Sequence, residues 1–230
     1  MRLDRFLNKF PAISRLDSRK LIHNGRVRID GQITQAAQIE IRPFHRVEVD
    51  NLLLQAGQHT QYWMLHKPVG VVSATEHNQH RTVIDLLDVA DKAGLHLAGR
   101  LDLNTSGLML ITNDGRWSKR ITQPVARKPK VYHVITEHPI TDEYAHVFEQ
   151  GIYFAYEKLT TLPAQLELLG EREARLTLFE GRYHQVKRMF GHFRNRVISL
   201  HRERIDQISL DPQLLPGQYR PLSHEEIMSV

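Results

Sequence analysis

Apolar residues recur at helical spacing near the start of the chain. Those of LDRFLNKF (residues 3–10) fall on one face, which predicts a first helix with a single buried stripe. Ser14, with Asp17 three residues later, is typical of a helix start, and the Asn-Gly pair at 24–25 is typical of a helix end. The pattern therefore predicts two short helices in the first 25 residues.

The next segment has the alternating pattern of a hairpin. In RVRIDGQIT (residues 26–34), Val27 and Ile29 alternate with arginines, and Asp30-Gly31 is a strong two-residue turn. A further strand is predicted at 46–50, and the polar stretch QAGQHTQ (55–61) has the composition of a linker.

Beyond this stretch, short apolar runs alternate irregularly with helical segments such as TDEYAHVFEQ (141–150). This order does not fit the regular alternation of a doubly wound parallel fold. We expect an α+β chain whose main sheet is mixed, mainly antiparallel and flanked by helices. The strand-like runs are YWML (62–65), VYHVIT (131–136), ARLTLF (174–179) and VISL (197–200). The expected domains are 1–57 and 62–230, with a linker at 58–61.

One acidic residue stands in an unusual place. In GRLDLNTSGLMLITNDG (99–115), Asp102 precedes an Asn-Thr-Ser-Gly turn, and the apolar run 108–111 then predicts a buried strand that ends in a turn at 113–115. Taken alone, Asp102 fits the common role of an aspartate that forms such a turn. It also places a carboxylate at the mouth of a hydrophobic sheet.

The composition and the distribution of charge indicate the class of protein and the kind of partner. The 230 residues are 41% hydrophobic and 25% charged, as in soluble globular proteins, and no run is long enough to span a membrane. The charged N-terminus is no signal peptide, so a cytoplasmic location is expected. Residues 1–57 carry ten Lys or Arg and six acids, most of the overall charge of +5. A basic module of this kind favours a polyanion as partner, although a solvated basic face without a partner is also compatible.

Several chemistries lack their motifs. The absence of cysteine excludes disulfides, Cys-ligated zinc and Cys nucleophiles. No GxGxxG or GxxxxGK[ST] motif is present, and Ser106 is not in a Gly-x-Ser-x-Gly elbow. The fourteen histidines show no HxH or HExxH spacing, so no metal site is expected.

A second basic segment predicts an amphipathic helix. In EGRYHQVKRMFGHF (180–193), Val186, Met189, Phe190 and Phe193 form an apolar stripe, and Lys187 lies at its edge. A lysine in this position either extends its ammonium group to water or meets an acid at the boundary of the core, and Asp102 is a suitable acid.

Two resemblances bring these features together. SRLDSRKLIHNGRVRIDGQI (14–33) resembles the S4 RNA-binding domain. GRLDLNTSGLMLITNDG, KVYHV (130–134) and EGRYHQVKRMF (180–190) resemble, in order, the motifs of the RsuA/RluB branch of the pseudouridine synthases. The resemblance implies that Asp102 is the catalytic nucleophile, that Tyr132 packs against the target uracil, and that Lys187 pairs with Asp102. On residue type alone, Tyr132 could equally be an ordinary strand aromatic.

The implied reaction converts uridine to pseudouridine in ribosomal RNA without a cofactor. The base must be flipped into a pocket to turn, and a carboxylate can attack C1′ or C6 or remove a proton at C2′. Within this branch, GRYHQVKRMF and LHRERI (200–205) most resemble the segments of members that modify small-subunit rRNA, which implies uridine 516 of 16S rRNA as the target. The alternatives are a 23S rRNA uridine and a non-catalytic role in rRNA binding or assembly. We expect a monomer with no membrane partner. The basic residues expected to contact RNA are Arg2, Arg5, Arg15, Arg19, Lys20, Arg26, Arg28, Arg100, Arg127, Lys128, Lys130, Arg182 and Arg188.

Overall fold

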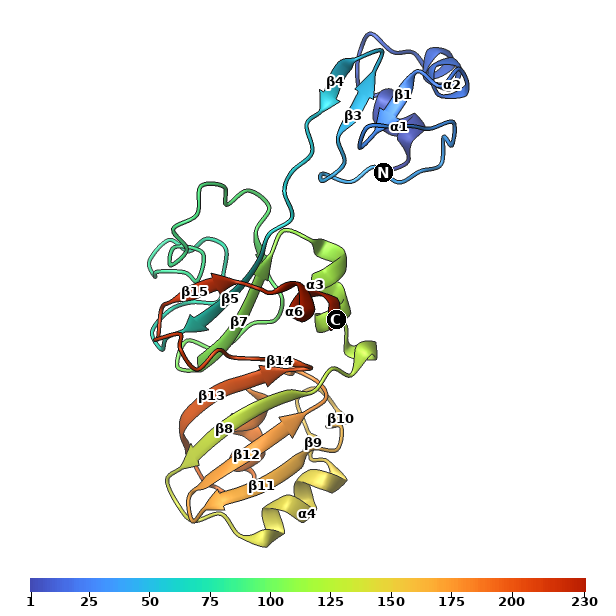
Figure 1. Ribbon diagram of the computed structural model, residues 1–230. Helices are drawn as coiled ribbons and strands as arrows, with labels where there is room; N and C mark the ends of the chain where they lie inside the picture. Colours follow the sequence, from blue (N-terminus) through green and yellow to red (C-terminus); the bar gives the residue numbers. More distant parts are fainter. The chain divides into compact units, whose positions relative to one another are not determined.

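The chain forms two compact units, residues 1–60 and 61–230, in a computed structural model that describes all 230 residues (Figure 1). The change from one unit to the other falls within the segment predicted as a linker. The backbone N–H of Gln58 donates to the carbonyl of Pro43 in the first unit, whereas that of Gln61 donates to the side chain of Asn113 in the second. No helix in the structure combines the length and the apolar character needed to cross a membrane.

The first unit begins with two helices, α1 (Leu3–Leu7) and α2 (Arg15–His23). The predicted start of α2 is confirmed, because the Ser14 and Asp17 side chains each accept a hydrogen bond from the other residue's backbone N–H. Helix α1 is shorter than predicted, because Pro11 disfavours helical backbone at the residue before it. Phe10 therefore lies beyond the helix, where its ring packs edge-on against Phe6 with centroids 5.5 Å apart.

The first unit also contains an antiparallel sheet with strand order β2-β1-β3-β4. The predicted hairpin is confirmed: Asp30 and Gly31 both have positive φ, 52° and 80°, as a two-residue turn between twisted strands requires. The strands are β1 (Val27–Ile29), β2 (Gln32–Ile33), β3 (Val47–Val49) and β4 (Leu52–Gln55). The core of this unit is Leu3, Phe6, Leu7, Ile22, Val27, Ile41, Val47 and Val49.

The second unit is built on a nine-stranded mixed sheet. Its main path runs β11-β12-β8-β13-β7-β5-β15, with β14 beside β13 and β6 beside β7. All pairs are antiparallel except β13 with β7, which confirms the predicted α+β class with a mainly antiparallel mixed sheet. The strands are β5 (Tyr62–Lys67), β6 (His96–Leu97), β7 (Ser106–Thr112), β8 (Lys130–Thr136), β11 (Gln165–Gly170), β12 (Glu173–Leu178), β13 (Val197–Ile205), β14 (Ile208–Ser209) and β15 (Tyr219–Pro221).

Helices and a small hairpin complete the second unit. They are α3 (Gly115–Thr122), the 3₁₀ turn η1 (Pro124–Ala126), α4 (Asp142–Gln150), α5 (Gln185–Gly191), α6 (His224–Met228), and the pair β9 (Tyr153–Phe154) and β10 (Leu159–Thr160). Helix α4 lies along β11 (Figure 1). The predicted turn at 113–115 is the start of α3, because the Asp114 side chain accepts hydrogen bonds from the N–H groups of Arg116 and Trp117.

Candidate active site

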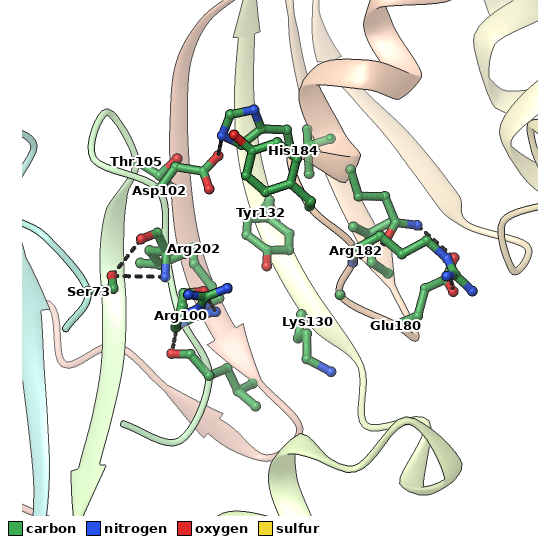
Figure 2. Close-up of a pocket in the computed structure, with 18 of the residues that line it drawn as sticks. Ser73, Arg100, Asp102, Thr105, Lys130, Tyr132, Glu180, Arg182, His184 and Arg202 are labelled. Atoms are coloured by element: carbon green, nitrogen blue, oxygen red, sulfur yellow. Dashed lines mark hydrogen bonds and ion pairs between the residues drawn. The ribbon is translucent and has the colours of Figure 1, made fainter. Parts of the chain in front are cut away.

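A pocket of about 410 Å³ lies in the second unit, within the size range of ligand sites (Figure 2). Its walls come from the loop before β7, from β8 and β13, and from the loop that joins β12 to α5. Asp102, Tyr132 and Lys187, which are far apart in the sequence, all line it. The fold therefore brings together the three residues to which the resemblance assigns catalytic roles.

The loop that carries Asp102 is held by the buried Arg202 and by Ser73. Arg202 of β13 is almost fully buried, and its guanidinium donates hydrogen bonds to the carbonyl oxygens of Leu108, at 2.9 Å, and Arg100, at 3.2 Å. The Ser73 hydroxyl donates to the Leu101 carbonyl at 2.5 Å and accepts the Leu101 N–H at 3.1 Å (Figure 2). These contacts fix the backbone on the N-terminal side of Asp102.

Lys67, at the end of β5, fixes the other side of the same loop. Its side chain is fully buried, and Nζ donates to the carbonyl oxygens of Thr105, at 2.8 Å, and Pro68, at 2.9 Å. Burial lowers the pKa of Lys67 to about 8; the negative charge of Asp102 opposes this shift, and Arg202 adds to it. Since a buried ammonium group needs polar partners, the loop carbonyls satisfy Lys67 while Lys67 orders the loop.

Gly107 is required where β7 meets β13. Its φ is +112°, and a Cβ at this position would lie 2.3 Å from the carbonyl oxygen of Arg202. Only glycine allows the two parallel strands to approach so closely at the base of the Asp102 loop.

Two basic side chains approach the Asp102 carboxylate. Lys187 Nζ lies 3.3 Å from Asp102 Oδ2, and His184 Nε2 lies 3.5 Å from the same oxygen. Of the two positions that the sequence left open for Lys187, the structure therefore shows the one beside an acid. The Asp102 and Lys187 side chains remain 29% and 31% exposed. The carboxylate is thus held by charge, while its oxygens stay accessible.

His184 is held in position by its backbone and by a neighbouring ring. It lies in the left-handed region, with φ at 49°, and its imidazole stacks on Tyr183 with ring centroids 3.9 Å apart. This backbone conformation is uncommon for a residue other than glycine and is frequent at functional sites. It directs the imidazole toward Asp102 (Figure 2).

Tyr132 provides an aromatic wall on β8. It is 8% exposed, and Figure 2 shows its ring between Asp102 and Arg182. Lys130, two residues before Tyr132 on the same strand, also lines the pocket, and burial lowers its pKa.

The cations around Asp102 would repel a metal ion, and no three His, Asp or Glu side chains cluster as metal ligands.

The same segments match known protein families. Residues 61–192 match the model of the RNA pseudouridylate synthase family, and residues 1–47 match the S4 domain model. The chain belongs to the RNA pseudouridylate synthase family. It is a pseudouridine synthase with an RNA substrate, and the resemblance seen in its motifs is confirmed.

Full-length relatives support the same assignment. The chain is similar to ribosomal small subunit pseudouridine synthase A of Pseudomonas aeruginosa, at 58% identity over 100% of both chains. The enzyme of that name from Escherichia coli is 46% identical, also over 100% of both chains. A crystal structure of a pseudouridylate synthase is 38% identical, with a TM-score of 0.73, covering 100% of this chain and 99% of that one.

The basic residues that the sequence suggested as RNA contacts of the synthase fall into different surroundings. Arg100, Lys130 and Arg182 line the pocket. The seven predicted RNA-contacting residues of the first unit are all exposed, and two of them, Arg2 and Arg26, form ion pairs with nearby aspartates. Lys128 pairs with Asp206 at 2.5 Å, and Arg127 has a left-handed backbone with φ at 45°.

Arg188, also predicted to contact RNA, is engaged by other residues of the protein. Its guanidinium makes two hydrogen bonds to the Glu157 carboxylate, at 2.5 and 2.6 Å, and lies 3.6 Å from the centre of the Phe154 ring. The guanidinium also donates to the Tyr183 carbonyl at 3.3 Å. Arg188 therefore joins the β9–β10 hairpin to the pocket loop, and its charge is already paired within the protein.

Four residues that build the site are not predicted from the sequence: Lys67, Ser73, His184 and Arg202. For two of them a pattern was present. Lys67 follows the buried Leu65 by two positions on a strand, and Arg202 follows the buried Leu200 in the same way. A charged residue at an inward strand position indicates a buried, hydrogen-bonded group.

Proposed function

We propose that this synthase isomerises one uridine of small-subunit ribosomal RNA, uridine 516 of 16S rRNA, without a cofactor. One observation carries the proposal: Asp102, Lys187 and Tyr132 meet in one pocket, in a chain whose full-length relatives are named ribosomal small subunit pseudouridine synthase A. Because one chain supplies Asp102, Tyr132 and Lys187, the proposed chemistry needs no second copy, and we propose that the enzyme acts as a monomer. A ribosomal RNA substrate supports a cytoplasmic location.

The reaction needs the base to leave the RNA stack. Breaking the bond from C1′ to N1, turning the uracil, and forming a bond from C1′ to C5 requires free rotation, so the nucleotide must be flipped into the pocket. The Tyr132 ring offers a flat face for the uracil, and its hydroxyl can assist when the C5 proton leaves. No atom is gained or lost overall, which is why the isomerisation can proceed without a redox or group-transfer cofactor.

Asp102 supplies the charged oxygen that starts the reaction. The carboxylate can add to C1′ or to C6, or remove the C2′ proton, and each route needs an ionised group in a site from which the RNA excludes water. Lys187 balances the carboxylate's charge, His184 lies beside the same oxygen, and Lys67, Ser73 and Arg202 hold its loop. A protein that only bound RNA would gain nothing from an acid among phosphates.

Tritium release from rRNA transcripts labelled at uridine C5 tests this function. The protein is incubated with a full-length 16S transcript and, separately, with a 23S transcript, and the pseudouridine is then mapped. We expect tritium release from 16S RNA alone, with the new pseudouridine at position 516. Tritium release from 23S RNA alone would show that the substrate is 23S rather than 16S RNA. The absence of release from both RNAs and from partly assembled subunits would favour a role in binding or assembly.

A further inference from the structure

The loop that joins β12 to α5 carries an aromatic ring for which the catalytic scheme has no use. Tyr183 is 72% exposed, which is unusual for a large aromatic side chain, and it lines the pocket. One face of the ring is covered by the His184 imidazole, at an interplanar angle of 21°. The degree of exposure leaves the other face open to solvent.

The open ring is held in place before any ligand arrives. His184 contacts both groups: the face of its ring stacks on Tyr183, and its Nε2 lies 3.5 Å from Asp102 Oδ2, so the catalytic carboxylate and the exposed ring share one neighbour. The backbone of Tyr183 is held by Arg188, which is itself bonded twice to Glu157. A ring that is already ordered loses little conformational entropy when a flat ligand stacks on it.

The surroundings indicate which flat ligand fits. Five Lys or Arg residues line the pocket against two acids, so its mouth attracts a polyanion. Nucleobases are the flat groups that a polyanion carries, and stacking on exposed aromatic rings is how proteins hold unpaired bases. Tyr132, almost fully buried, is the aromatic wall for the flipped uracil, which leaves the exposed Tyr183 for a different base.

We propose that Tyr183 is a stacking platform for an unpaired base next to the target uridine. A base beside a flipped nucleotide loses one stacking neighbour, and the open face of Tyr183 replaces it. The inference rests on the proposed function only in that the substrate strand must enter the Asp102 pocket. It adds a binding position for a second nucleotide and predicts tolerance for any base there, because every base has a face that can stack.

A fluorescent RNA tests the platform apart from turnover. The probe is a short single-stranded RNA in which 2-aminopurine flanks one uridine on both sides, and stacking quenches its fluorescence. We expect the wild-type protein to quench it, Tyr183→Ala to lose the quenching and bind about tenfold more weakly, and Tyr183→Phe to restore most of both. Tyr156→Ala is the matched control, because Tyr156 is 94% exposed but does not line the pocket.

The same proteins are then assayed for tritium release from 16S RNA. We expect Tyr183→Ala to raise KM about tenfold and to change kcat much less, because a neighbouring base is bound equally before and during the reaction. The platform is refuted if Tyr183→Ala quenches the probe like the wild type, if Tyr156→Ala loses as much, or if Tyr183→Phe is as defective as Tyr183→Ala. Quenching through Tyr183 without any tritium release would instead refute the proposed function and leave the platform intact.

Discussion

Replacing Lys187 by Met tests the contact between its ammonium group and the Asp102 carboxylate. Methionine keeps the length and packing of the side chain and removes its charge. At 3.3 Å, two unit charges attract by about 5 kcal/mol at an effective dielectric constant of about 20. Both side chains are about 30% exposed, however, so lost hydration offsets most of this attraction. In the free protein we expect Lys187→Met to lower the unfolding free energy by about 1 kcal/mol.

The same substitution should matter more during the reaction. When a flipped base fills the pocket, water no longer screens the carboxylate, and the cost of the missing charge approaches about 3 kcal/mol, the lower end for a buried pair. His184 remains near the same carboxylate oxygen and limits the loss of catalytic rate. We therefore expect Lys187→Met to lower the single-turnover rate about 100-fold.

Three measurements separate these effects. Denaturant unfolding gives stability, single-turnover tritium release across the pH range gives the chemical step, and titration with RNA gives affinity. Lys187→Arg should recover part of the rate, since it restores the charge with a bulkier group. Lys119→Met, on the exposed side of α3, controls for the loss of one positive charge. Wild-type single-turnover rates for Lys187→Met at every pH would refute the role of the ion pair.

Three further predictions concern the scaffold. Removing residues 1–60 should weaken RNA binding and flatten the plot of log affinity against log salt, since most of the net charge lies there; an unchanged slope would contradict this. Gly107→Ala should lower the unfolding free energy, measured by denaturant, by more than about 3 kcal/mol. Gly115→Ala should be tolerated, because the space around its Cβ is open. Similar losses of unfolding free energy in the two variants would disprove the close approach of the strands. Burial lowers the pKa of Lys67 to about 8 from its ordinary 10.5, so between these values only the unfolded chain keeps the proton. The unfolding free energy should rise with pH across that window by about 3 kcal/mol, and Lys67→Met should abolish the rise; equal pH slopes in the two proteins would count against it.

Local interactions made part of this structure predictable from sequence. The capping box at Ser14 and the Asp30-Gly31 hairpin each depend on residues within a few positions of one another, and both are present as predicted. Helix α3 was missed because Asp-Gly also fits a turn. Trp117 and Ile121, one helical turn apart, are both buried in a core cluster with Met64, Leu108 and Leu110, and this burial favours the helix.

A local pattern can indicate that Lys67 and Arg202 are buried, but it does not reveal the partners through which they support the catalytic loop. Lys67 bonds to a carbonyl 38 residues away, and Arg202 to one 94 residues away. Both are charged residues in strands, and only the finished sheet shows that they face the loop. The position of His184 depends on a left-handed backbone that its sequence neighbours do not predict. The motif residues could be named from the sequence, whereas the groups that hold them required the fold.

The most direct test of the central claim is tritium release from 16S RNA by Asp102→Asn. The amide has almost the same shape as the carboxylate but is neither nucleophilic nor basic, and it removes a charge that repels phosphate. We expect no detectable pseudouridine from this variant, with RNA affinity equal to that of the wild type or slightly higher. Tritium release by Asp102→Asn at a rate near that of the wild type would contradict the assignment of Asp102 as the catalytic residue.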